Sequence, residues 1–368
     1  MGERKRGRSV AIKAALAGLV TLGVAGAFVA PTAFGASANG PTPAASSSTG
    51  SSAAAAASSA PSGGAATPGA PGSGSMSVAP RVATVAATTW NSAAAAKFWT
   101  PARIAAAIPD EAAPAKVGGS GVQAASTTVS HAATTASNTV TSATIAHSYH
   151  FGGTPETGII VYASSNLTTH YCTASVVNSA GHNMIVMAAH CNPGSWMAYV
   201  PMYQHGALSQ PYGIWAVTKV FKDAHYSSGE SDASDYDYAF AQVAPNASGQ
   251  LIQNVTGGYH LAYTSSYYLY ITALGYPDIS SDPADEAIRC SPNYRTGKLA
   301  GYRQMVLYCT GFYGGTSGGP WVTYFNGTTG NLIGLTGGYE EGGPNSWTSY
   351  SPIFDSRIFS LFSYAQTH

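Results

Sequence analysis

The sequence predicts an all-β domain that begins near His147 and runs to the end of the 368 residues, after an N-terminal region of low complexity. From His147 onward Tyr, Val, Ile, Trp and Gly become common, in short apolar runs separated by turn residues, which is typical of short strands. Before that point Ala, Ser, Thr, Gly and Pro dominate. Such a composition buries too little apolar surface to offset the entropy of the chain.

The first residues follow the order of a secretory signal peptide. A basic cluster between Arg4 and Arg8 precedes an apolar run over residues 14–30, and Ala36-Ser37-Ala38 offers a cleavage site. We expect residues 1–38 to be removed on export, which would leave an extracellular protein without a membrane anchor. A single membrane anchor is the alternative, because about 17 apolar residues could just span a bilayer.

We predict a disordered linker over residues 39–80, since residues 39–75 are nearly all Ala, Ser, Gly, Pro and Thr. Residues 81–146 remain Ala- and Thr-rich, but the segment TTWNSAAAAKFWTPARIAAAIP contains aromatic residues and a short helical pattern. This piece could fold only weakly alone. We interpret residues 81–146 as a propeptide, with an ordinary linker as the alternative.

The charge of the later part argues against nucleic acid as a partner. Residues 147–368 hold seven Lys and Arg against thirteen Asp and Glu, a net charge of −6, whereas the whole chain is neutral because the signal region is basic. An acidic module without a run of basic residues binds nucleic acid poorly. We expect a monomer with no nucleic-acid partner.

All four cysteines lie in this acidic part, and an even number behind an export signal suggests disulfides. Three pairings are possible. The sequence-local pairing closes two loops of similar size, and each could stabilise the domain by about 3 kcal/mol. A zinc site is a weak rival because no C-x-x-C pair occurs. The cysteines are Cys172, Cys191, Cys290 and Cys309.

A candidate catalytic histidine follows a predicted hairpin. In CTASVVNSAGHNMIVMAAHC, residues 172–191, the apolar runs SVV and MIVMAA flank a polar turn at Asn178–Asn183. His190 follows the second strand and directly precedes a cysteine that could tether it. Since the chain contains ten histidines, this position alone does not establish a role.

Acidic residues compete as the partner of this histidine. In SDASDYDYAFAQV, residues 231–243, an acidic loop leads into a strand with Asp237 at its start. Asp235 lies two residues earlier and would share its side of the strand, so periodicity does not decide between them. Asp232 is further from the strand.

The stretch GGTSGGPW, residues 314–321, contains the candidate nucleophile Ser317. A serine hydroxyl is a weak nucleophile and needs a base within hydrogen-bond reach. Glycines let backbone amides approach a developing oxyanion closely, and the amides of Gly315 and Ser317 are the candidates here. A glycine-rich turn without function is the alternative.

Taken together and in this order, the three segments resemble the chymotrypsin/trypsin family of serine endopeptidases, and in particular its bacterial secreted branch, which is related to the glutamyl endopeptidases. TASVV…MAAHC is similar to the strands that lead to the family's histidine, DYAFAQV to the strand that bears the acid, and GTSGGP to the nucleophile motif. The resemblance covers residues 147–368. It selects Asp237 over Asp235, and it implies a disulfide between Cys172 and Cys191.

The resemblance implies two packed six-stranded antiparallel β-barrels, over residues 147–255 and 256–368, with the active site between them. It implies a triad of His190, Asp237 and Ser317 that hydrolyses peptide bonds of protein or peptide substrates through an acyl-enzyme. Neither a metal nor an organic cofactor is expected.

One departure concerns activation. Thr316 stands where animal trypsin-like enzymes carry an acid that pairs with the new N-terminus, and the basic residue before Ile-Val-Gly-Gly is missing. The nearest apolar start is GIIVYA, Gly158 to Ala163. We therefore expect activation without that ion pair. WTPARIAAAIP, Trp99 to Pro109, resembles pro-regions of secreted bacterial relatives, which predicts a pro-segment that inhibits or assists folding.

The substrate pocket is predicted from the same resemblance, at Gly311 to Gly315 and at Leu335 to Tyr339. Gly311 falls where trypsin-like enzymes carry an acid, so cleavage after Lys or Arg is disfavoured, and no His for glutamyl specificity is present. We expect a small or apolar side chain before the scissile bond. The candidate pocket residues are Gly311, Phe312, Thr336, Gly337 and Gly338.

Two other functions are compatible with the sequence. One is a non-catalytic binding module on the same fold, and intact His190, Asp237 and Ser317 argue against it. The other is a cell-surface protein whose Ala/Ser tract is a stalk, which predicts that this tract stays on the mature protein.

Overall fold

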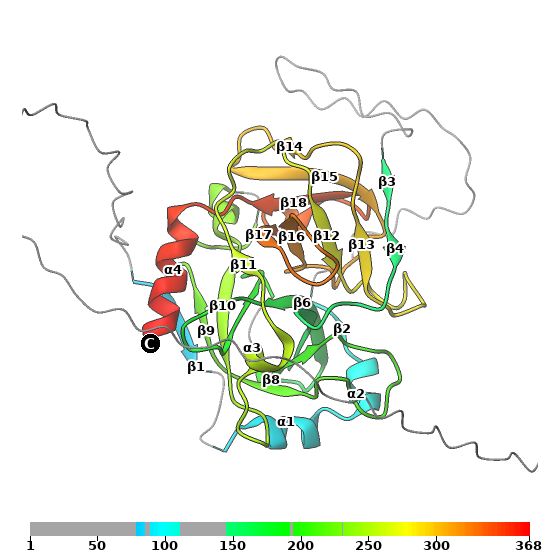
Figure 1. Ribbon diagram of the computed structural model, residues 1–368, viewed down its shortest axis with the longest axis vertical. Helices are drawn as coiled ribbons and strands as arrows, with labels where there is room; N and C mark the ends of the chain where they lie inside the picture. Colours follow the sequence, from blue (N-terminus) through cyan, green and yellow to red (C-terminus); the bar gives the residue numbers. More distant parts are fainter. Residues whose placement is uncertain (1–78, 85–88, 111–144, 192–193, 230) are drawn as a thin grey trace, which may run out of the picture. The chain divides into compact units, whose positions relative to one another are not determined.

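The computed structural model describes residues 79–84, 89–110, 145–191, 194–229 and 231–368 (Figure 1). The predicted signal peptide, nearly all of the predicted linker, and residues 111–144 of the predicted propeptide lie outside the described residues. The described part is mostly β, with four α-helices, and none of these helices is long and apolar enough to cross a membrane.

Six antiparallel strands of the first half form a closed barrel. The hydrogen-bonded order is β9-β10-β7-β6-β5-β8, and pairing of β8 with β9 closes the ring. The strands are β5 (Thr157–Ala163), β6 (Thr169–Val176), β7 (Met184–Met187), β8 (Ser195–Pro201), β9 (Trp215–Lys222) and β10 (Ala239–Val243).

These strands form because their residues are apolar, β-branched or aromatic and have both faces covered. Every residue of β5 and of β7 is buried. β6 and β7 pair antiparallel on either side of the Asn178–Asn183 turn, as the predicted hairpin requires. Gly158 in β5 is needed for the close approach of β8, since a Cβ there would lie 2.1 Å from the carbonyl oxygen of Val200.

In the second half the strands are divided between two sheets. The larger has the order β11-β17-β16-β12-β13-β4, and the smaller contains β14, β15 and β18, with β3 paired to β15. The strands are β3 (Ala146–His147), β4 (Tyr149–His150), β11 (His260–Leu261), β12 (Thr272–Gly275), β13 (Ile288–Cys290), β14 (Gly297–Lys298), β15 (Gln304–Thr310), β16 (Pro320–Thr323), β17 (Asn331–Leu335) and β18 (Thr348–Pro352).

Three elements cross between the halves. β3 and β4 belong by sequence to the first half but pair with strands of the second. Helix α4 (Ser356–Thr367) packs back on β9 and β10 of the first barrel, with Ile358, Leu361 and Ala365 buried (Figure 1). A short helix, α3 (Ile252–Thr256), joins the halves.

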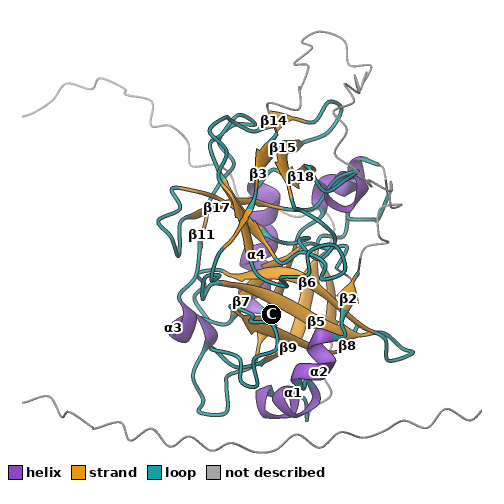
Figure 2. Cartoon of the chain, turned by 90° about the vertical axis from the view of Figure 1, so that its right-hand side faces the viewer, coloured by secondary structure: helices purple, strands orange, loops and turns teal. Residues whose placement is uncertain are grey.

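The segment before the β-domain is also folded. α1 (Ser92–Phe98) and α2 (Pro101–Ala105) correspond to the helical pattern in the sequence, and α1 lies beside β8 and β9 (Figure 2). Asn91 caps α1, while Thr100 caps α2 with Pro101 at its first position. Strand β1 (Arg81–Thr84) adds to β9, and strand β2 (Ile108–Pro109) adds to β6.

Candidate active site

His190 and Asp237 form a buried pair. His190 lies just after β7, and its Nδ1 is 2.6 Å from Asp237 Oδ2, while its backbone N–H donates to Asp237 Oδ1 at 2.8 Å. The side chains are 2% and 1% exposed. An ionised carboxylate can only accept, so the proton lies on Nδ1 and Nε2 is the imidazole atom that can take up a second proton.

The environment of Asp237 holds its carboxyl in the charged form. Burial by itself would raise the pKa, but the charge of His190 and hydrogen bonds from His190 and Gly338 outweigh burial, so the pKa of Asp237 lies below its ordinary value. The Gly338 amide donates to Asp237 Oδ2 at 2.7 Å. The segment after β17, in the second half of the molecule, is thereby attached directly to the acid of the first half.

Asp235 has different partners. It lies in the 3₁₀ helix Asp232–Tyr236, and its Oδ1 accepts from the Arg303 amide at 3.0 Å and from Gln304 Nε2 at 3.0 Å. The helical turn directs Asp235 and Asp237 apart, although a strand would have placed them on one side. Of the two competing acids, Asp237 is the one that contacts His190.

The turn that holds Ser317 is bound to strand β6. The Thr173 amide donates to the Ser317 carbonyl at 2.8 Å, and Thr173 Oγ1 donates to the Gly315 carbonyl at 2.8 Å. Gly318 has φ +79°, and a Cβ there would lie 2.2 Å from Thr173 O and 2.9 Å from Ala188 N. Glycine is therefore required for close packing against the strand end that leads to His190.

The amides proposed for the oxyanion come from the same turn. The Ser317 amide donates to no carbonyl of the described residues, which leaves it available to a ligand. Gly315 has φ +89°, and a Cβ there would lie 2.6 Å from the Tyr171 ring. Thr316 is buried, and its Oγ1 donates to the Tyr313 carbonyl at 2.8 Å. The turn itself thus supplies the hydrogen-bond partner of the Thr316 hydroxyl. A buried acid at this position would instead need a cation as its partner.

A cavity of about 300 Å³ opens beside Ser317. Two of the candidate pocket residues, Phe312 and Thr336, line it. Gly311 is instead packed so that a Cβ would meet Ser148 Oγ, and Gly337 and Gly338 lie against Asp237. The full lining is Phe312, Tyr313, Gly314, Thr316, Ser317, Thr336, Glu340, Glu341, Gly342, Gly343, Pro344, Asn345 and Ser349.

The sequence reasoning missed the part of this lining that follows Tyr339, residues 340–345 and Ser349. Glu340 and Glu341 have φ of 50° and 53°, the left-handed region that side chains rarely occupy. Their turn brings the Glu341 carbonyl to Ser317, whose Oγ donates to it at 3.3 Å. The available signal was the glycine-flanked YEEGG after the second pocket segment.

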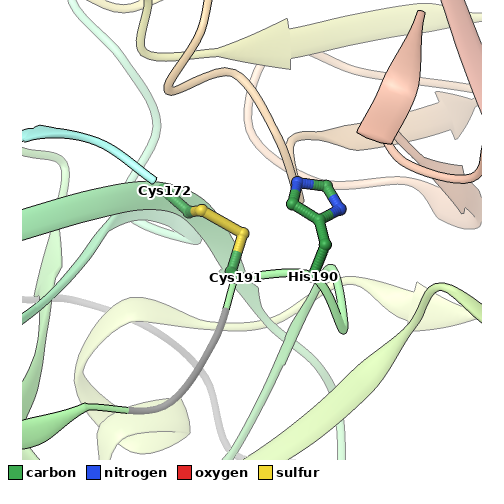
Figure 3. A group of neighbouring side chains, drawn as sticks. All are labelled: Cys172, His190 and Cys191. Carbon is green, nitrogen blue, oxygen red and sulfur yellow. A yellow bond between two sulfur atoms is a disulfide. The ribbon is translucent and has the colours of Figure 1, made fainter. Parts of the chain in front are cut away.

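Both sequence-local disulfides are present, Cys172–Cys191 and Cys290–Cys309. Figure 3 shows the first beside the His190 imidazole. The two sulfurs and a ring nitrogen lie within 4.8 Å of one another, a spacing that would suit a metal ion. Disulfide sulfurs are not thiolates, however, so this group lacks the ligands of a zinc site.

The structure is similar to those of serine proteases. Protease Anisep from Arthrobacter nicotinovorans is 24% identical over 60% of this chain and 100% of its own, with a TM-score of 0.52. The thermostable serine protease AL20, from an extremophilic microorganism, is 25% identical over 58% of this chain and 98% of its own, with a TM-score of 0.50. A Glu endopeptidase in complex with MPD is 16% identical over 61% and 98%, with a TM-score of 0.47. No family model and no curated protein matches the chain.

The chain therefore has the chymotrypsin-like fold, and the solved structures named above that share it are serine proteases. This confirms the predicted all-β class.

Proposed function

We propose that the chain is a secreted serine endopeptidase that hydrolyses peptide bonds with Ser317, His190 and Asp237. The observation that carries the proposal is the buried His190–Asp237 pair. The segment Thr336–Gly338 bonds both to this pair and to the turn that holds Ser317. Asp237 bonds to both His190 and Gly338, and the Gly318 amide donates to the Thr336 carbonyl at 2.7 Å. One network thus connects all three residues.

The chemistry follows from the protonation states. Ser317 Oγ attacks the substrate carbonyl carbon while its proton passes to His190 Nε2, and Asp237 stabilises the resulting imidazolium. The amides of Gly315 and Ser317 donate to the oxyanion. The C–N bond breaks as His190 returns the proton to the leaving amine, and water then hydrolyses the ester by the same steps in reverse order.

The hydrogen bond between the Ser317 hydroxyl and the Glu341 carbonyl must break during this reaction. The hydroxyl has to donate its proton to His190 instead. The left-handed turn at Glu341 supplies a reason for mobility, since each such residue costs roughly 1–2 kcal/mol relative to an ordinary conformation. We propose that substrate binding turns the Tyr339–Gly342 segment toward an extended form, in which its backbone can pair with the substrate.

A covalent probe tests the nucleophile. A fluorophosphonate should label the wild type and the exposed-serine control Ser228→Ala equally, and it should not label Ser317→Ala. His190→Ala should lose most labelling, with a fall in peptide hydrolysis on the order of 10⁴- to 10⁶-fold. Equal labelling of wild type and Ser317→Ala would exclude the mechanism, and an unlabelled, folded wild type would favour a binding module.

Cleavage of a peptide library tests the pocket. We propose a small or apolar side chain before the scissile bond, and the carboxylates of Glu340 and Glu341 at the cavity disfavour acidic ones. A strong preference for Lys or Arg would show instead that these glutamates select the substrate, and a preference for Glu would contradict both ideas.

Secretion and processing belong to the same proposal. The order of residues 1–38 and the two disulfides support export to an oxidising compartment. N-terminal sequencing of protein from the culture medium should find residues 1–38 and the Ala/Ser tract removed. Retention of that tract would support the stalked cell-surface alternative.

A further inference from the structure

Residues 89–110, which we call the strap, are bound to the first barrel by buried side chains and by hydrogen bonds to its backbone. Trp99 is fully buried and its Nε1 donates to the Trp196 carbonyl at 2.7 Å, while Trp90 Nε1 donates to the Met197 carbonyl at 3.0 Å. Ser92 Oγ accepts from the Ala216 amide at 3.1 Å. The strap therefore satisfies backbone groups of β8 and β9 as well as covering apolar surface.

The end of the strap reaches the strand that supports the nucleophile turn. Ile108 and Pro109 pair with His170 and Tyr171 of β6. Ile104 and Ala107 belong to one buried cluster with Tyr171, which is 6% exposed. Together with Tyr203, these three residues line a small pocket, and all four belong to the same buried cluster.

Tyr171 in turn packs against the oxyanion turn. The Tyr171 hydroxyl donates to the Pro277 carbonyl at 2.9 Å, and this hydrogen bond holds the outer end of the ring in place. A Cβ added to Gly315 would lie 2.6 Å from Tyr171 Cε2 and 2.7 Å from Cζ, so the ring rests on the Gly315 backbone. Two residues along the same strand, Thr173 holds the Gly315 carbonyl. The position of the Gly315 amide thus depends on the position of this ring.

We propose that the strap is a retained, activating part of the folded protein, which holds Tyr171 against Gly315 and so positions the oxyanion-binding amide. If the chain were cleaved after Asp110, the strap would then stay bound to the barrel. Loss of the strap would lower kcat. The positioning role rests on the proposed peptidase activity, whereas retention of the strap does not.

Retention is tested with the full chain. A recognition sequence for a specific endopeptidase is inserted between Gly119 and Ser120 in a Ser317→Ala background, which prevents self-digestion. After cutting, gel filtration and mass spectrometry should find the strap fragment with the β-domain. Trp99→Ala should release at least part of it, because that variant removes the most buried anchor. Separation of the unaltered strap fragment from the β-domain without denaturant would overturn the proposal.

Positioning is tested by separating kcat from KM in the active chain. Ile104→Ala and Tyr171→Ala should each lower kcat by about tenfold or more while KM stays within about twofold, because the oxyanion amide acts in the transition state. The double variant should be no worse than Tyr171→Ala alone. Tyr171→Phe, which keeps the ring, should retain most of kcat.

Phe98→Ala is the matched control. Phe98 stacks on Trp196 at 5.2 Å between ring centroids, on a part of the strap that does not line the Tyr171 space. It should lower the melting temperature without changing kcat. An equal kcat loss in Phe98→Ala, or a rise of kcat in Ile104→Ala, would show that the strap does not act through Tyr171. A wild type that no fluorophosphonate labels would refute the peptidase function and leave the gel-filtration result valid.

Discussion

Asp235 and Asp237 lie two positions apart in the chain but have different hydrogen-bond partners. Asp235 accepts from the Arg303 amide and the Gln304 side chain, and Asp237 accepts from His190 and Gly338. Alternation in a strand would have put both carboxylates on one side. The 3₁₀ helix that ends at Tyr236 removes that alternation, which is why the sequence pattern left the choice open.

Substitution of each acid should give opposite results. We expect Asp237→Asn to lower kcat by about 10⁴-fold, since the amide favours the wrong tautomer of His190. Asp235→Asn should keep kcat near that of the wild type and lower the melting temperature, because it weakens buried hydrogen bonds. Peptide hydrolysis and thermal unfolding measured on both variants check this. A larger kcat loss in Asp235→Asn would mean that the acid is wrongly assigned.

Acid should remove the stabilisation that Asp237 provides. The folded-state pKa of Asp237 lies below its ordinary value of 3.8, so its stabilising effect is present above that pH and is lost as the pH falls through the folded-state pKa. The difference in melting temperature between Ser317→Ala and Ser317→Ala/Asp237→Asn should therefore narrow as the pH falls from 5 to 2. A difference that widens over this range would contradict the direction of the shift.

At the scale of elements, helix α4 completes the core of the first barrel. Phe354 precedes the helix, and Ile358, Leu361 and Ala365 lie on its buried face, in the same apolar cluster as β7 and β10. Leu361→Ala should lower the free energy of unfolding by about 2–5 kcal/mol. Ser363→Ala, an exposed change on the same helix, should alter it by less than about 0.5 kcal/mol. Denaturant unfolding compares them, and similar effects would show that the helix is not a core element.

The sequence predicted the hairpin before His190 and a short helical pattern in the strap because both depend on local patterns, whereas the division into two helices came only from the structure. The sequence did not predict how firmly the strap is bound, since the partners of Trp90 and Trp99 lie in β8, about a hundred residues along the chain. Nor did it predict the turn at Glu340 and Glu341, because left-handed residues are usually Gly or Asn. The stretch GGTSGG was recognisable by its glycines, and a Cβ at Gly315, Gly318 or Gly319 would lie 2.6 Å or less from a neighbouring atom.

At the scale of the whole molecule, each half contains one disulfide between cysteines that are close in the sequence. Cys172–Cys191 and Cys290–Cys309 each close a loop of 19 residues. Replacing Cys290 and Cys309 by serine should lower the free energy of unfolding by about 3 kcal/mol. Dithiothreitol should likewise lower the melting temperature of the wild type, whereas a chelator should leave it unchanged. A drop caused by the chelator alone would indicate a metal that contributes to the fold.

Helix α4 has a consequence for the order in which the molecule is made. It follows every other described element along the chain, yet it covers the barrel that contains His190 and Asp237. In a chain that emerges with its N-terminal end first, the apolar surface that this helix covers therefore stays uncovered until the helix has arrived. Because Ser317 lies 80 residues after Asp237, a partly synthesised chain can hold the His190–Asp237 pair without Ser317. If Ser317 is the nucleophile, as proposed, this order delays hydrolysis until the whole domain is present.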